Sequence, residues 1–64
     1  MGVYYTVEKT GTNHIRDFDG IDAAVDHAAN LLHIETLNVD IVLAALDKSG
    51  EYRRGKIRIV ECNQ

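Results

Sequence analysis

The segment from Asp40 to Cys62 constrains the fold of this 64-residue chain more than any other. Its first part, Asp40–Asp47, is apolar at every position between two acids, and its second part, Tyr52–Cys62, alternates basic residues with glycine and isoleucine. Between them Gly50 lies in a short polar stretch and can adopt a positive φ without steric cost. This pattern predicts a long β-hairpin, with strands over residues 40–47 and 52–62.

Two further strands are expected before this hairpin. Val3–Lys9 is rich in β-branched and aromatic residues, which favour a pleated and half-buried surface. After a turn containing Gly11, His14–Phe18 reads as a short second strand whose only aliphatic residue is Ile15. A short polar strand is typical of a sheet edge, because brevity and charge discourage unwanted pairing.

One amphipathic helix is predicted between these strands and the hairpin. Asp19 is a preferred N-cap residue, and Asp22 adds a carboxylate to the first turn, where the helix dipole favours it. The helix is expected to end between His33 and Leu37. Its apolar stripe follows the helical period: Ile21, Ala24, Val25, Ala28, Leu31 and Leu32.

The order strand, strand, helix, strand, strand predicts one α+β domain over residues 1–64 with two layers, a β-β-α-β-β fold. The helix is expected on one face of a four-stranded antiparallel sheet of order 2-1-3-4. This order makes the polar second strand an edge and the apolar third strand central. The other sheet face would then remain open.

The apolar third strand has more hydrophobic surface than one helix can cover. Both of its alternating faces are apolar, whereas an antiparallel sheet with one wet face normally carries polar residues there. An apolar centre with a charged rim is the usual anatomy of a binding face, although long Arg and Lys stems can also cover such a surface. We therefore expect a partner-binding face, and the simplest partner is a second copy of the chain in a homodimer. The residues expected to form it are Tyr4, Thr6, Leu43, Arg54, Lys56 and Arg58.

A nucleic-acid-binding module is the alternative prediction. Arg54, Lys56 and Arg58 share one strand parity, which would place their charges about 7 Å apart on one sheet face. Tyr4 could add a stacking surface for single-stranded nucleic acid. The formal net charge of −3 argues against this alternative.

The acidic side of the predicted helix offers a third possibility, a divalent-cation or small-ligand site. Asp22, Asp26, Asn30 and His33 recur at about helical spacing, but their spacing matches no known metal loop. The same stripe could instead attract a basic partner. We predict no metal and no cofactor.

Nothing in the chain predicts catalysis. Cys62 is the only cysteine, and it has neither a CxxC partner nor a helix N-terminus to lower the pKa of its thiol. Ser49 lies in a predicted turn without a partnered base, and the isolated glycines form no phosphate-binding loop. We therefore predict a protein that is not an enzyme.

The single cysteine, the absence of a leader and the lack of a long apolar run predict a cytoplasmic protein with no membrane partner. The predicted function is a small non-enzymatic protein-interaction module that acts as a regulator or inhibitor by docking on another protein. On background expectation alone, very small acidic domains of this sort are often products of phages or mobile elements.

Overall fold

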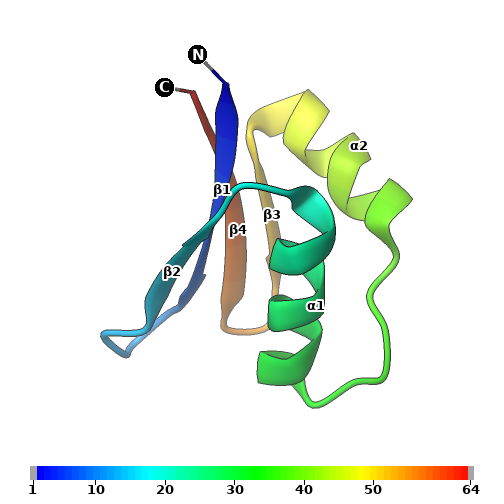
Figure 1. The fold of residues 1–64 in the computed structure, drawn as a ribbon. Coiled ribbons are helices and arrows are strands. Elements are labelled where there is room, and N and C mark those ends of the chain that lie inside the picture. The colour runs from blue at the N-terminus through cyan, green and yellow to red at the C-terminus, as the bar shows by residue number, and fades with distance from the viewer. Residues whose placement is uncertain (1, 64) are drawn as a thin grey trace.

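The computed structural model describes residues 2–63, which form a four-stranded sheet and two helices (Figure 1). Both helices lie on the same side of the sheet, so the fold has two layers and one open sheet face. The elements in chain order are β1 (Val3–Lys9), β2 (Ile15–Phe18), α1 (Ile21–Leu32), α2 (Val39–Ser49), β3 (Glu51–Arg54) and β4 (Ile57–Asn63).

The strand order in the sheet is β2-β1-β4-β3, and all neighbouring strands are antiparallel. The central pair, β1 and β4, is in register from Val3 opposite Asn63 to Lys9 opposite Ile57. The first and last strands of the chain are therefore neighbours in the middle of the sheet. The predicted α+β class, the antiparallel four-stranded sheet and the edge position of β2 are confirmed.

The prediction of a strand over residues 40–47 is wrong, because this segment is the helix α2. Asn38 is its N-cap, and its side-chain Oδ1 accepts hydrogen bonds from the backbone N–H groups of Asp40 (2.9 Å) and Ile41 (3.3 Å). Gly50 ends the helix in the left-handed conformation, with φ of 80°, and its N–H donates to the Leu46 carbonyl oxygen. These two caps favour the helix over the strand.

The predicted second arm of the hairpin is itself a complete hairpin. Gly55 and Lys56 form a two-residue turn between β3 and β4, and Gly55 has a φ of 59°. Glycine at the first central position of such a turn matches the right-handed twist of the two strands. The predicted single strand over residues 52–62 is therefore divided, and β4 takes the central place in the sheet that the prediction gave to residues 40–47.

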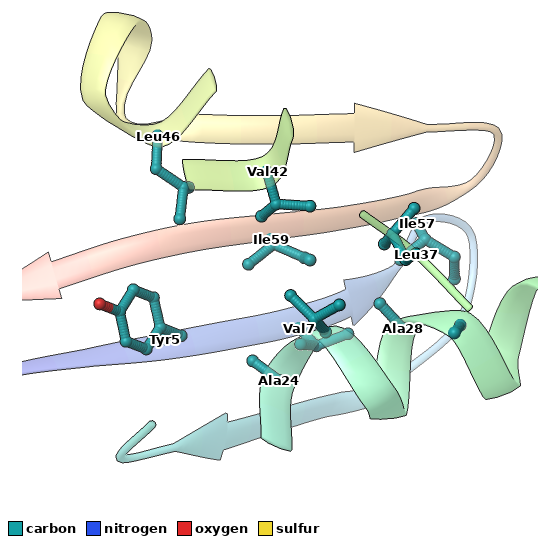
Figure 2. Close-up of a cluster of buried hydrophobic side chains, with 11 residues drawn as sticks. Tyr5, Val7, Ala24, Ala28, Leu37, Val42, Leu46, Ile57 and Ile59 are labelled. Carbon is teal, nitrogen blue, oxygen red and sulfur yellow. The ribbon is translucent and has the colours of Figure 1, made fainter. Parts of the chain in front are cut away.

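The core lies between the sheet and the two helices (Figure 2). Val7 of β1, Ile59 of β4 and Val42 of α2 are fully buried, so each layer contributes to the same cluster. From α1 the buried residues include three alanines, whose small side chains let the helix lie close to the sheet. The remaining buried members of the cluster are Tyr5, Val25, Leu37, Leu46 and Ile57.

The predicted amphipathic helix is confirmed as α1, with small differences at its ends. Its N-cap is Gly20 rather than Asp19, and the Gly20 position carries no side-chain capping hydrogen bond. The helix ends at Leu32, and His33 follows in the left-handed conformation with φ of 59°. The helix is therefore closed by backbone hydrogen bonds alone, from the N–H groups of His33 and Ile34.

Candidate functional site

Three of the predicted partner-binding residues, Tyr4, Thr6 and Arg58, have the parity of the open sheet face. Tyr4 is opposite Cys62 and Thr6 is opposite Val60, both in β4, and all four side chains share the parity that points away from the helices. The Thr6 hydroxyl donates a 2.8 Å hydrogen bond to the carboxylate of Asp17 in β2. The centre of this face is thus half-buried and mixed in polarity.

The thiol of Cys62 lies within this group of side chains. Its Sγ atom is 3.9 Å from the Thr6 hydroxyl oxygen. The interaction with Cys62 raises the pKa of the Tyr4 hydroxyl above its usual value, and burial and the Asp17 carboxylate act in the same direction. The Tyr4 hydroxyl is therefore a neutral hydrogen-bonding group at physiological pH and adds no charge to this face.

The three predicted basic residues do not share one sheet face. Arg58 is on the open face, opposite Glu8 of β1 and Arg53 of β3. Arg54 is opposite Ile57, whose side chain is buried in the core, and therefore has the parity of the helix-covered face. Lys56 lies in the turn. The prediction of a continuous basic row fails because the two-residue turn divides the segment in two.

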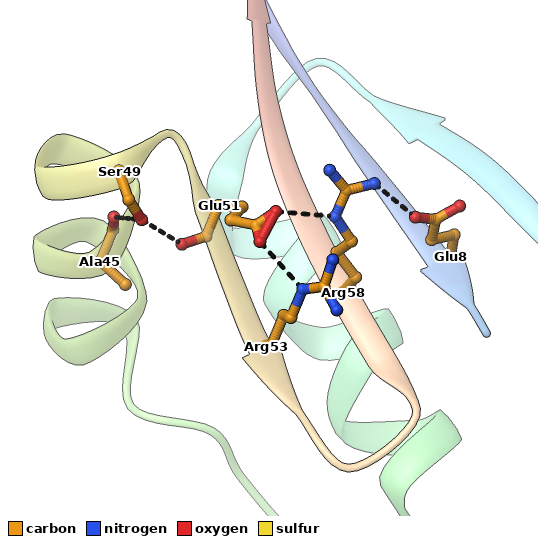
Figure 3. Close-up of polar contacts among 6 residues, drawn as sticks. All are labelled: Glu8, Ala45, Ser49, Glu51, Arg53 and Arg58. Carbon is orange, nitrogen blue, oxygen red and sulfur yellow. Dashed lines mark hydrogen bonds and ion pairs between the residues drawn. The ribbon is translucent and has the colours of Figure 1, made fainter.

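The guanidinium of Arg58 forms ion pairs with carboxylates of the two neighbouring strands (Figure 3). Its guanidinium donates from Nη1 to Glu8 (2.6 Å) and from Nε to Glu51 (3.0 Å), and Arg53 donates to the other Glu51 oxygen (2.9 Å). These bonds raise the pKa of Arg58, with Glu8 as the largest cause. They lower the pKa of Glu51, mainly through Arg58 and then Arg53. The network joins β1, β4 and β3, and it leaves Arg58 less able to bind a phosphate.

The largest exposed aliphatic side chains of the second helix are the clearest candidate for a working surface. Val42 and Leu46 of α2 are buried, whereas Ile41 is 58% exposed and Leu43 is 38% exposed. The predicted surplus of apolar residues in this segment is thus present, although on a helix and not on the sheet. Leu43 and Ala44 lie on the flank of α2 that also carries Asp47, and we call this flank the α2 surface. Ile41, two residues before Leu43, lies about 200° away around the helix axis, on the other flank.

A hollow of about 340 Å³ adjoins the α2 surface. Leu43 and Ala44 of α2 supply its apolar wall, and the carboxylates of Asp47 and Glu61 supply negative charge from α2 and β4. The end of α2 is held in place by Ser49, whose hydroxyl oxygen is 3.2 Å from the carbonyl oxygens of both Ala45 and Glu51 (Figure 3). The hollow can receive a side chain that combines an aliphatic part with a positive charge.

The sequence analysis named Leu43, although as a strand residue on the sheet face, and it named none of the other residues of the hollow. Asp47 and Glu61 come from segments that become neighbours only in the fold, and no spacing in the sequence connects them. The acidic residues of α1, in contrast, lie on a helix that the sequence predicted correctly. Among residues 2–63, however, no three His, Cys, Asp or Glu side chains lie close enough to bind a metal ion.

Within the described part of the chain, neither helix has the length and apolarity needed to cross a lipid bilayer. No protein-family model, curated protein or solved structure matches this chain.

Proposed function

We propose that this protein is a small non-enzymatic interaction module that docks on another protein through the α2 surface. The observation that supports it best is the exposure of Leu43 beside a hollow. The fold buries one side of the eleven-residue helix α2 and leaves aliphatic side chains exposed outside that side. Burying the Leu43 side chain against a partner would contribute roughly 1.5–3 kcal/mol.

The chemistry of the hollow favours a basic segment on the partner. A lysine or arginine can lay its aliphatic stem on Leu43 and Ala44 while its charge lies near Asp47 and Glu61. The whole chain has a formal net charge of −3, which would speed the approach of a basic partner. A small domain that covers a basic surface in this way would act as a regulator or inhibitor.

The nucleic-acid alternative loses its main geometric support. It required three cations on one sheet face, whereas Arg54, Lys56 and Arg58 lie on different sides of the β3–β4 hairpin. Arg58 is also bound by two carboxylates. These contacts favour the protein-docking function.

Binding to an arrayed peptide library would test the proposed function. Each peptide would contain one leucine, with neighbouring positions either basic, neutral or acidic. We expect the wild-type protein to bind the basic members preferentially and to lose this binding at high salt. Leu43→Ser should weaken binding to all of these peptides, and Asp47→Lys should remove the preference for basic ones.

Ile15→Ser is the matched control, because Ile15 is 60% exposed but belongs to β2 and not to α2. This variant should bind the peptides as the wild type does. Equal binding of acidic and basic peptides, or unchanged binding by both Leu43→Ser and Asp47→Lys, would contradict the proposal. A second copy of the chain as the occupant would be recognised by a concentration-dependent mass of the wild-type protein without peptide.

A further inference from the structure

Two histidines from different elements meet at the surface between the β1–β2 turn and α1. His14 immediately precedes β2, His27 is in the middle of α1, and their Nε2 atoms are 2.8 Å apart. Both side chains are half-buried. This contact is separate from the α2 surface, and the proposed function does not use it.

The ring geometry shows what kind of contact this is. The two ring planes are within 15° of parallel, and the ring centroids are 5.0 Å apart. Because the nitrogens are so much closer together than the centroids, both nitrogens lie nearly on the line between the rings. The two Nε2 atoms therefore point at each other. This is the geometry of a nitrogen-to-nitrogen hydrogen bond, and a chelated metal would instead require both lone pairs to converge on a third point.

Such a bond depends on the number of protons that the pair holds. One Nε2 must carry a hydrogen and the other must offer its lone pair, which is possible when at least one of the rings is neutral. When both rings are protonated, two N–H groups and two positive charges face each other across the contact. The pair must then separate.

The surroundings of His27 oppose its protonation further. The ring of Phe18 lies 5.2 Å from the ring of His27, and the Arg16 guanidinium lies 5.9 Å from the Phe18 ring centre. Burial lowers the pKa of His27 below 6.5, and the charges of His14 and Arg16 act in the same direction. The charged groups that face His27 from the β2 side are thus basic, and α1 itself contributes the acids Asp22 and Asp26, both exposed.

We propose that His14 and His27 form a proton-operated latch that fastens the start of β2 to helix α1. The latch is closed when the pair carries at most one extra proton and opens when both rings are protonated. Opening leaves the pairing of β1 with β2 intact, because that pairing rests on the strand register and on the Thr6–Asp17 hydrogen bond. The loosened contact is the one between the edge strand and the helix.

The direction of the pH effect follows from the lowered pKa of His27. The unfolded chain binds a proton near pH 6.5, whereas the folded chain resists it. The stabilisation is therefore fully present above about pH 6.5 and is lost as the pH falls through the pKa of folded His27.

Nuclear magnetic resonance of the histidine rings in the wild-type protein tests the latch without any substitution. We expect the His27 ring to titrate below 6.5, and the amide signals of residues 14–18 and of the middle of α1 to shift together with it. The His27 Nε2 signal should show a hydrogen bond at neutral pH. If His27 titrated at its ordinary value, with no accompanying shift near β2, the proposal would be overturned.

Two variants add an independent measurement. His14→Gln keeps a polar side chain but removes one titrating ring, so the pKa of His27 should rise and the loss of thermal stability between about pH 7 and pH 5 should become smaller. His33→Asn is the control, because His33 is exposed and asparagine tolerates its left-handed backbone. An equal pH dependence of the melting temperature in wild type, His14→Gln and His33→Asn would also overturn the latch.

Discussion

At the scale of single residues, Asn38 stabilises the start of the helix α2. Its side chain accepts hydrogen bonds from two backbone N–H groups that would otherwise have no partner at the start of α2. Asp40, in the first turn, adds a negative charge where the helix dipole favours it. These interactions favour a helix in a segment that contains isoleucine, valine and leucine in succession and has high β-propensity.

Asn38→Ala should therefore destabilise the folded protein. Loss of an N-cap of this kind costs about 1 kcal/mol, which is a large share of the stability available to a domain of this size. Chemical denaturation followed by circular dichroism would measure the change in the free energy of unfolding. Asn30→Ala is the matched control, since Asn30 is exposed within α1 and its replacement by alanine improves helix propensity. An Asn38→Ala variant as stable as the wild type would show that the cap is dispensable.

Glu51 is the second residue with a specific expected effect. Its lowered pKa means that the folded state holds the charged carboxylate more strongly than the unfolded state does. The contribution of Glu51 to stability is therefore present above about pH 4.5 and is lost as the pH falls through the pKa of the folded state. Glu51→Gln should reduce stability at neutral pH and flatten the decline in acid.

Thermal melting between about pH 6 and pH 3 would measure this difference, and added salt should reduce it because the side chains are partly exposed. Glu35→Gln serves as the control. Glu35 is exposed, and within residues 2–63 it makes no hydrogen bond or ion pair through its side chain. Parallel acid profiles for the wild type and Glu51→Gln would show that the network does not affect folding.

At the scale of elements, α2 shows where sequence reasoning failed and why. A run of six apolar residues, Ile41 to Leu46, has no clear period and fits a buried strand as well as a helix. The deciding signals lie outside the run, in Asn38 before it and Gly50 after it. Reading Gly50 as a hairpin turn was correct about its positive φ and wrong about the element that it ends.

β1, β2 and α1 were more predictable because their patterns are local. The alternation in β1 and the helical stripe of α1 each identify one buried face without any knowledge of distant residues. Gly55 was more difficult, because an isolated glycine within a strand pattern is typical of a bulge and also of a tight turn. Only the antiparallel pairing of Arg54 with Ile57 distinguishes the two.

Substitutions along α2 can verify the helical assignment. Leu46 is 3% exposed, and Leu46→Ala should cost about 2–5 kcal/mol through lost burial and a residual cavity. Ile41→Ala removes a side chain that is 58% exposed and should change stability by no more than about 0.5 kcal/mol. Urea denaturation would give both values. A larger loss for Ile41→Ala than for Leu46→Ala would contradict the orientation of the helix.

At the scale of the whole molecule, the hydrophobic surplus and the charges are arranged differently from the prediction. The two-layer α+β architecture was predicted correctly, although from an element order that contained one helix and not two. The surplus apolar side chains, however, lie on the helix α2, and the open face carries the Glu8–Arg58–Glu51–Arg53 network. The candidate site was only partly predictable, because the hollow combines residues that are distant in the sequence.

This arrangement changes where a homodimer, predicted from the sequence, would form. A sheet-to-sheet dimer would have to bury ion pairs, whose desolvation offsets much of their attraction. Contact through the α2 surface would instead bury Leu43, and a symmetric dimer would bury it twice. A second copy is the rival occupant of this surface. If it bound there, the wild-type mass in sedimentation would rise with concentration, and Leu43→Ser would remove that rise while Ile15→Ser would retain it. A monomer mass at every concentration would refute self-association. The α2 surface would then bind a different protein and not a second copy.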